Sequence, residues 1–125
     1  MPHYPPDAQF LHLCDSLGLY VLDELAGWQK AYSTKAARPL VREMVRKDVN
    51  HPSLIFWDNG NEGGTNQELD AEFGCYDLSQ RPVIHPHHRP GNAASGIDCN
   101  YYENYHIAKQ ILADSLIYMP TKFLH

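Results

Sequence analysis

The segment MVRKDVNHPSLIFWDNGNEGG, residues 44–64, determines the interpretation of the whole chain. Its start completes an amphipathic helix predicted over residues 39–49, with Pro39 near the first turn. The apolar run at residues 51–57 is typical of a strand buried in a parallel sheet. A polar loop, residues 58–64, follows and carries Glu62. The order of helix, buried strand and polar loop predicts a carboxylate held at the end of a strand.

The same order recurs on both sides of this segment. Helices are predicted over residues 7–17, 66–76 and 103–114, and further strands over 19–25, 81–85, 97–101 and 115–119. The apolar spacing of the first helix predicts that its buried face consists of Phe10, Leu13, Cys14 and Leu17. Asp7 is predicted to cap its start and Gly18 to end it. Alternating strands and helices predict an α/β fold, here with one open parallel sheet of five strands.

Polar side chains directly follow several of these strands. They are Asp23 and Glu24, Asn61 and Glu62, His85, and Tyr101 and Tyr102. In α/β proteins the carboxyl ends of parallel strands meet on one side, where active sites are assembled. The sequence therefore predicts a single functional face built from several loops.

Composition limits the possible partners. The chain has 125 residues, predicted as one domain over 1–125, and a net charge of −5 without a basic stripe, which argues against nucleic acid. No apolar run approaches the ~18 residues of a membrane span. The first residues, MPHYPPDAQF, lack the pattern of a signal peptide, so the compartment is left undetermined. The three cysteines form no CxxC pair, and we expect them to be reduced and buried.

The segments HYPPDAQFLHLCDSLGLYVLDE and MVRKDVNHPSLIFWDNGNE resemble the catalytic barrel of glycoside hydrolase family 2, which includes β-galactosidases, β-glucuronidases and β-mannosidases. The resemblance extends from His3 to about Val83, and more weakly through IDCNYY to the end. It implies a (β/α)₈ TIM barrel, of which this chain would hold about strands 3 to 7 with their intervening helices. A complete barrel needs ~250 residues, so the resemblance implies a partial one.

The resemblance also assigns roles to individual residues. Glu62 matches the general acid/base and Asn61 the asparagine that binds the sugar 2-hydroxyl. His3 matches a histidine that lines the sugar pocket, although it could also be a turn residue. Asp23 and Glu24 match an acidic pair that contacts substrate or holds barrel loops. Tyr101 and Tyr102 resemble the end of the sixth strand, where a tyrosine hydrogen-bonds the nucleophile.

The nucleophile of this family has no clear counterpart. In the register that the resemblance implies, Lys122 occupies its position; alternatively, the glutamate lies beyond His125. The leading hypothesis is therefore a fragment of a retaining β-glycosidase, β-galactosidase-like, that is weak or inactive alone. The rival hypothesis is a non-catalytic, degenerate barrel that binds carbohydrate or only self-associates.

The remaining predictions concern partners and cofactors. The expected ligand is a β-glycoside or oligosaccharide, with no cofactor, nucleic acid or membrane. Two prolines and an arginine interrupt the histidine-rich segment at residues 85–90, so we predict no metal site there or elsewhere. Exposed strands at the edges of an open sheet favour a homo-oligomer, or a chain that needs further segments for stability.

Overall fold

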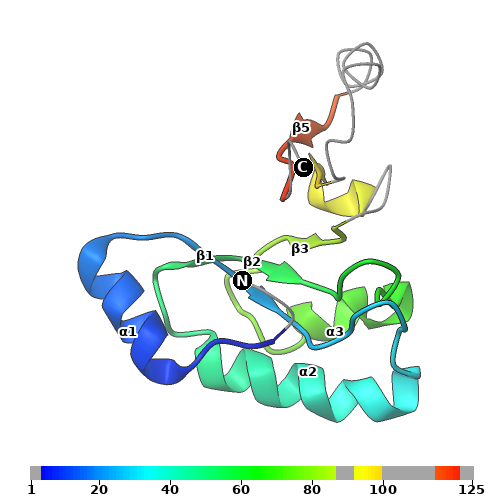
Figure 1. Cartoon of the computed structure of the whole chain (residues 1–125), viewed down its shortest axis with the longest axis horizontal. Coiled ribbons are helices and arrows are strands. Elements are labelled where there is room, and N and C mark those ends of the chain that lie inside the picture. The colour runs from blue at the N-terminus through cyan, green and yellow to red at the C-terminus, as the bar shows by residue number, and fades with distance from the viewer. Residues whose placement is uncertain (1–3, 87–91, 100–114, 122–125) are drawn as a thin grey trace.

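The computed structural model describes residues 4–86, 92–99 and 115–121 (Figure 1). Its helices are α1 (Ala8–Leu17), α2 (Thr34–Asp48) and α3 (Asp70–Gly74), with the short 3₁₀ helices η1 (Gln67–Leu69) and η2 (Ala93–Ser95). Its strands are β1 (Val21–Glu24), β2 (Leu54–Asp58), β3 (Val83–Ile84), β4 (Ile97–Asp98) and β5 (Ile117–Tyr118). The predicted helix at 103–114 lies outside the described residues.

All strand pairs in the described residues are parallel, which confirms the predicted α/β class. Strands β1, β2 and β3 form one sheet in that order, and β4 pairs with β5 in a second. Each of the five predicted strands is therefore present, but the described ranges contain two sheets and not one. Glu24 lies opposite Asp58 in the β1–β2 register, so the two strands end side by side.

Local capping explains where the first two helices begin and end. Asp7 caps α1 by accepting a hydrogen bond from the Gln9 amide, and Gly18 ends the helix in the left-handed conformation (φ 69°), both as the sequence predicts. The start predicted for the second helix is wrong, because Ser33 caps α2 and the helix begins at Thr34, five residues before Pro39. Pro39 consequently lies inside the helix.

The predicted buried face of α1 is also largely wrong. Leu11 and Cys14 are buried against Val21, whereas Phe10, Leu13 and Leu17 are exposed. The buried contacts of the helix with the sheet form this narrow seam, so much of its remaining apolar surface is exposed among the described residues. Cys75 is exposed, contrary to expectation, although all three cysteines are free thiols as predicted.

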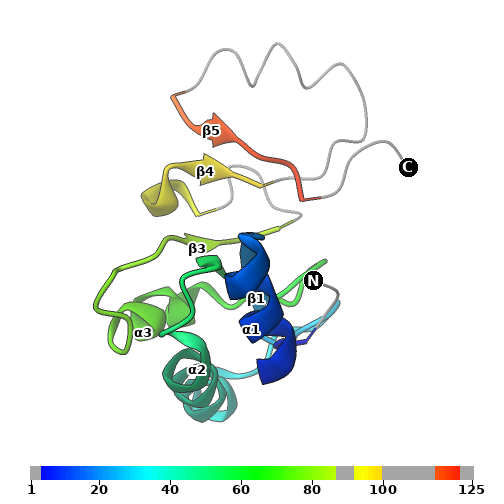
Figure 2. The same ribbon diagram turned by 90° about the vertical axis from the view of Figure 1, so that its left-hand side faces the viewer.

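The two faces of the three-stranded sheet are covered differently. Helices α2 and α3 lie on one side, and the β4–β5 pair lies on the other (Figures 1 and 2). The core on the helix side includes Leu25, Val41, Val45, Trp57 and Phe73. On the other side Ile84, Ile97 and Cys99 pack with Leu22, Phe56 and Met119. Trp57 is fully buried, as the sequence predicts.

Within the ranges that the structure covers, no helix combines the length and apolar character required to cross a membrane.

Candidate active site at the carboxyl end of the sheet

The loops that follow β1 and β2 are joined to each other by backbone hydrogen bonds. The Leu25 amide donates to the Asp58 carbonyl (2.8 Å), and the Asn61 amide donates to the Gly27 carbonyl (2.7 Å). The Gln29 amide in turn donates to the Asn61 carbonyl (3.2 Å), and Trp28 and Asn61 form a parallel bridge. The parallel pairing thus continues past the ends of both strands into the loops.

Glycines permit this close approach. A Cβ atom on Gly64 would lie 2.0 Å from the Gly27 carbonyl oxygen, and one on Gly60 would lie 2.5 Å from the Gly64 carbonyl oxygen. Both separations are far below a van der Waals contact, and the oxygens belong to backbone that is itself hydrogen-bonded. The glycines of NGNEGG therefore let two loops pack backbone against backbone.

Glu62 lies at the tip of the second loop. Its backbone is in the left-handed region (φ 47°), which is uncommon for a residue with a side chain. Its side chain is partly exposed, and Oε2 accepts a hydrogen bond of 2.7 Å from the Trp28 indole Nε1. The loop backbone and the indole thus fix the direction of this carboxylate at the carboxyl end of β2.

Asn61 is almost completely buried beside it. Its backbone carbonyl accepts hydrogen bonds from the Gly64 amide in its own loop (2.8 Å) and from the Gln29 amide in the loop after β1. Asn61 therefore holds the backbone that presents Glu62.

Buried carboxyl groups gather on the sheet face opposite the helices. Glu24 and Asp58 are adjacent in the register and both are buried. Burial, and then the neighbouring Glu24 charge, raise the pKa of Asp58 well above its usual range. Burial, together with the charges of Asp58 and Asp98, raises the pKa of the Cys99 thiol to about 12. The ends of β1, β2 and β4 therefore converge on one acidic region.

Asp23 faces the other way, although the sequence pairs it with Glu24. Successive residues of a strand point to opposite faces, and Asp23 shares its face with Val21 and Leu25, which pack among the helices. Its carboxyl group is close enough to that of Asp48 in α2 for the two charges to interact. Burial, and then the Asp48 charge, raise the pKa of Asp23 to about 8. The structure thus separates the two members of the predicted acidic pair.

Four residues that the sequence singles out lie outside the described ranges: His3, Tyr101, Tyr102 and Lys122. Conversely, Trp28 and Asp58 belong to the site but were not singled out. Asp58 directly follows a buried apolar run, which is the same signal that pointed to Asn61 and Glu62. Nothing in the sequence pairs Trp28 with Glu62, because the two are 34 residues apart.

His85 is buried in a polar cluster at the end of β3. Its Nε2 lies 2.8 Å from Asp70 Oδ1, which also accepts from the Asn59 amide nitrogen (2.7 Å). Asn59 additionally donates to the Asn66 carbonyl (2.9 Å). These contacts tie β3 to the loop after β2 and to α3.

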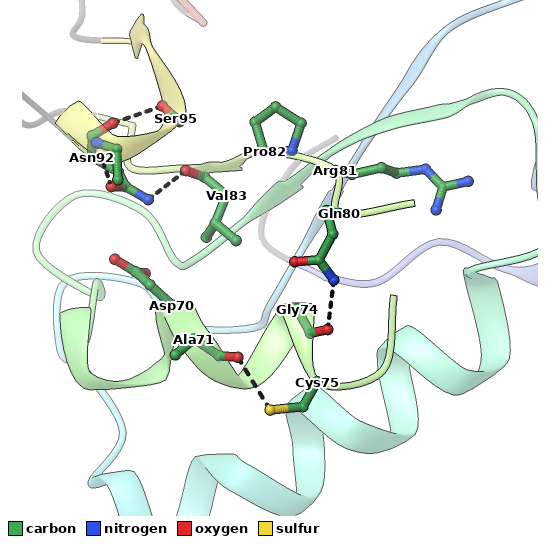
Figure 3. Close-up of a pocket in the computed structure, with 11 residues that line it drawn as sticks. Asp70, Ala71, Gly74, Cys75, Gln80, Arg81, Pro82, Val83, Asn92 and Ser95 are labelled. Carbon is green, nitrogen blue, oxygen red and sulfur yellow. Dashed lines mark hydrogen bonds between the residues drawn. The ribbon is translucent and has the colours of Figure 1, made fainter. Parts of the chain in front are cut away.

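Pockets of about 470 and 540 Å³ border these elements. The smaller one adjoins the candidate site and is lined by residues that include Trp28, Lys30 and Tyr32. The larger one lies between α3, β3 and η2 (Figure 3). Two polar side chains of its wall donate hydrogen bonds to backbone carbonyls, Gln80 to Gly74 (2.9 Å) and Asn92 to Val83 (2.8 Å). Glu62 does not line either pocket.

A parallel sheet with helices on its outer face and carboxylates at the carboxyl ends of its strands is the arrangement of α/β-barrel proteins. Residues 1–112 match the family model described as "Glycosyl hydrolases family 2, TIM barrel domain". The chain therefore belongs to glycoside hydrolase family 2 and is part of its catalytic-barrel domain, as the sequence resemblance implies.

Individual relatives agree with this assignment. The chain is 33% identical over 122 residues to a β-galactosidase of Aeromonas hydrophila, covering 83% of this chain and 11% of that protein. It is 47% identical over 72 residues to a β-galactosidase of Thermoanaerobacterium thermosulfurigenes, covering 55% of this chain and 10% of that protein. The chain thus spans about a tenth of the length of these relatives.

Solved structures confirm the fold. A Bifidobacterium dentium β-glucuronidase complexed with coumarin-3-O-glucuronide aligns with a TM-score of 0.77 at 20% identity, covering 98% of this chain and 27% of that one. A Faecalibacterium prausnitzii β-glucuronidase aligns with the same TM-score at 22% identity, covering 98% of this chain and 28% of that one. The predicted partial TIM barrel is therefore confirmed as the fold class.

Proposed function

We propose that this chain supplies the general acid/base of a retaining β-glycosidase, and that this residue is Glu62. The observation that carries the proposal is how Glu62 is held. The chain belongs to this family, and the Trp28 indole donates a hydrogen bond of 2.7 Å to the Glu62 carboxylate. The loop that carries Glu62 is held to the neighbouring loop by the hydrogen bond from the Asn61 amide to the Gly27 carbonyl. A catalytic acid needs such fixed geometry, because proton transfer requires the donor within hydrogen-bond reach of the leaving oxygen.

The proposed chemistry is hydrolysis with retention. The protonated Glu62 carboxyl group gives its proton to the glycosidic oxygen as the bond to the anomeric carbon breaks and a second carboxylate attacks that carbon. The resulting Glu62 carboxylate then takes a proton from the water that hydrolyses the glycosyl ester. Asn61, His3, Tyr101 and Tyr102 are proposed to bind the sugar or the nucleophile. Glu24 is proposed to contact the substrate or to hold the acidic region around it.

In a retaining enzyme the nucleophilic carboxylate lies about 5–5.5 Å from the carboxyl group of the acid/base. We do not assign it to a described residue, and Lys122 is the residue at the position that the family resemblance indicates. The 125 residues are accordingly proposed as one structural unit, part of the catalytic barrel, that is weak or inactive alone. Self-association through exposed strand edges is the corresponding proposal for its assembly.

The substrate class is proposed from the relatives. Several proteins that match this chain are named β-galactosidases, and the solved neighbours include β-glucuronidases. Because the sequence similarity is to the former, we propose a β-galactoside as the preferred substrate.

The test is hydrolysis of a panel of p-nitrophenyl β-glycosides by the purified chain, by Glu62→Gln and by a matched control, Glu43→Gln. Glu43 is an exposed residue of α2, remote in sequence from the loops of the site. General acid/base catalysis contributes roughly 10²–10⁴-fold, so Glu62→Gln should lower kcat/KM by that factor while Glu43→Gln leaves it unchanged.

The leaving group separates an acid from a residue that merely shapes the loop. A dinitrophenyl leaving group departs without a proton, so its glycosides should be far less sensitive to Glu62→Gln than the p-nitrophenyl glycosides. Equal losses with both leaving groups would contradict the role of Glu62 as acid. Absence of hydrolysis on every sugar would support either an incomplete barrel that is inactive alone or the alternative, a non-catalytic barrel that binds carbohydrate or self-associates.

A further inference from the structure

Three metal-ligating side chains meet at the end of the sheet opposite to Glu62. His12 and Asp15 belong to α1, and His51 lies in the turn between α2 and β2. One potential ligand atom from each lies within 4.8 Å of the other two. The turn precedes β2, whereas Glu62 follows it, so the whole length of that strand separates this cluster from the proposed catalytic residue.

Two members of the cluster are held firmly in place. Asp15 Oδ1 accepts from the Ser53 amide (2.9 Å), and Asp15 Oδ2 lies 2.6 Å from His51 Nδ1. The His51 backbone is fixed as well, because its amide donates to the Asp48 carbonyl (3.1 Å) and its carbonyl accepts from the Leu54 amide (3.2 Å). The carboxylate and imidazole therefore come from two different elements that are locked together.

His12 completes the group from the solvent side. It lies three residues before Asp15, so both project from one face of α1. Its ring meets the His51 ring edge-on, with centroids 4.9 Å apart and an interplanar angle of 66°. Its side chain is exposed, so it can rotate toward a bound ion without changing the helix, and water can complete the coordination.

The donor types indicate which ion would bind. Two imidazoles and one carboxylate suit Zn²⁺, whereas Mg²⁺ and Ca²⁺ prefer oxygen ligands alone. We propose that His12, Asp15 and His51 form a Zn²⁺ site that joins α1 to the turn before β2.

Binding requires only a small adjustment. The 2.6 Å between Asp15 Oδ2 and His51 Nδ1 is a hydrogen-bond distance. Two ligands of a tetrahedral Zn²⁺, each at about 2.0–2.2 Å from the metal, lie roughly 3.4 Å apart. The ion therefore takes the place of the shared proton, and the two atoms separate by less than ~1 Å. The imidazole then carries its proton on Nε2, the ring nitrogen that does not bind the ion.

The experiment is titration of the full chain with ZnCl₂ by isothermal calorimetry. His12→Gln removes an exposed ligand and leaves the Asp15–His51 contact intact. The matched control is His87→Gln/His88→Gln, which removes two histidines from the histidine-rich segment.

The expected result is one tight Zn²⁺ equivalent, with affinity lowered about 100-fold or more in His12→Gln, since even outer partners of metal ligands contribute 10–100-fold. Affinity in the control should stay within about threefold of the parent chain. Absence of saturable binding, or binding that survives His12→Gln, would overturn the site. Because the site is remote from Glu62, this result is independent of the proposed glycosidase function.

Discussion

Asp23 and Glu62 are two acidic residues that the native structure holds at an energetic cost, and the costs have different origins. Asp23 is completely buried on the helix side of β1, where its charge is disfavoured. Glu62 is partly exposed, so its charge meets solvent, but its backbone is left-handed. Burying a charge changes stability with pH, whereas a left-handed backbone costs ~1–2 kcal/mol at any pH. Only the second arrangement leaves the carboxylate accessible to a substrate.

The comparison also explains why the loop after β2 can bear this strain. Gly27, Gly60 and Gly64 pack backbone against backbone, so the loop has little freedom to relax. Strain of this kind persists only where the surroundings over-determine the conformation. Asp23, by contrast, lies within β1 and its backbone is not left-handed.

The largest expected effect comes from filling the contact between the two loops. In Gly64→Ala the new Cβ would lie 2.0 Å from the Gly27 carbonyl oxygen, so the loops must separate. We expect a loss of about 3 kcal/mol or more in the free energy of unfolding, measured by urea denaturation. Gly18→Ala is the control, because no atom lies within 4 Å of its Cβ and only its positive φ is strained. Equal losses in both variants would show that the loop contact does not hold the site.

Asp23→Asn should have the next largest effect, and the effect should depend on pH. The pKa of Asp23 is raised from 3.8 to about 8, so the folded state binds the proton more tightly than the unfolded state. Its contribution to stability is therefore complete below about pH 4 and is lost as the pH rises toward 8.

The asparagine variant removes this ionisation and keeps a hydrogen-bonding group beside Asp48. At ~1.4 kcal/mol per pH unit, the stability of this variant relative to the parent chain should increase by about 2.8 kcal/mol from pH 5 to pH 7. Urea unfolding across this range measures the difference. Asp7→Asn serves as the control because asparagine caps a helix as well as aspartate does. A pH-independent difference for Asp23→Asn would refute the buried proton.

The smallest expected effect isolates backbone strain at Glu62. Glycine adopts φ 47° without steric cost, so Glu62→Gly should be more stable than Glu62→Gln by about 0.5 kcal/mol, after the entropy cost of glycine is subtracted. The same replacement in a regular helix, Glu43→Gly in α2, should instead cost about 1 kcal/mol. If Glu62→Gly destabilised the chain as much as Glu43→Gly, strain at residue 62 would not distinguish the loop from the helix.

Local patterns predicted a large part of the fold and of the site. The caps Asp7 and Gly18, the buried strand ending in Trp57 and the polar loop with Asn61 and Glu62 all depend on neighbours in the chain. The start predicted for α2 is wrong because Ser33, an ordinary local capping residue, begins the helix before Pro39. The exposed face of α1 has a different reason, since apolar spacing shows which residues can be buried together but not whether another element covers them.

The sequence by itself determined the strand–helix alternation, the family and the identity of Glu62 as the candidate acid, because these depend on residue type and short spacing. Only the tertiary structure decided that Asp23 turns away from Glu24 toward Asp48, since the orientation of each strand residue depends on which face the helices cover. Only the tertiary structure joined Trp28 to Glu62 and His51 to Asp15, separated by 34 and 36 residues. Contacts between loops at the two ends of a parallel sheet form when the strands pair, and no local pattern records that pairing.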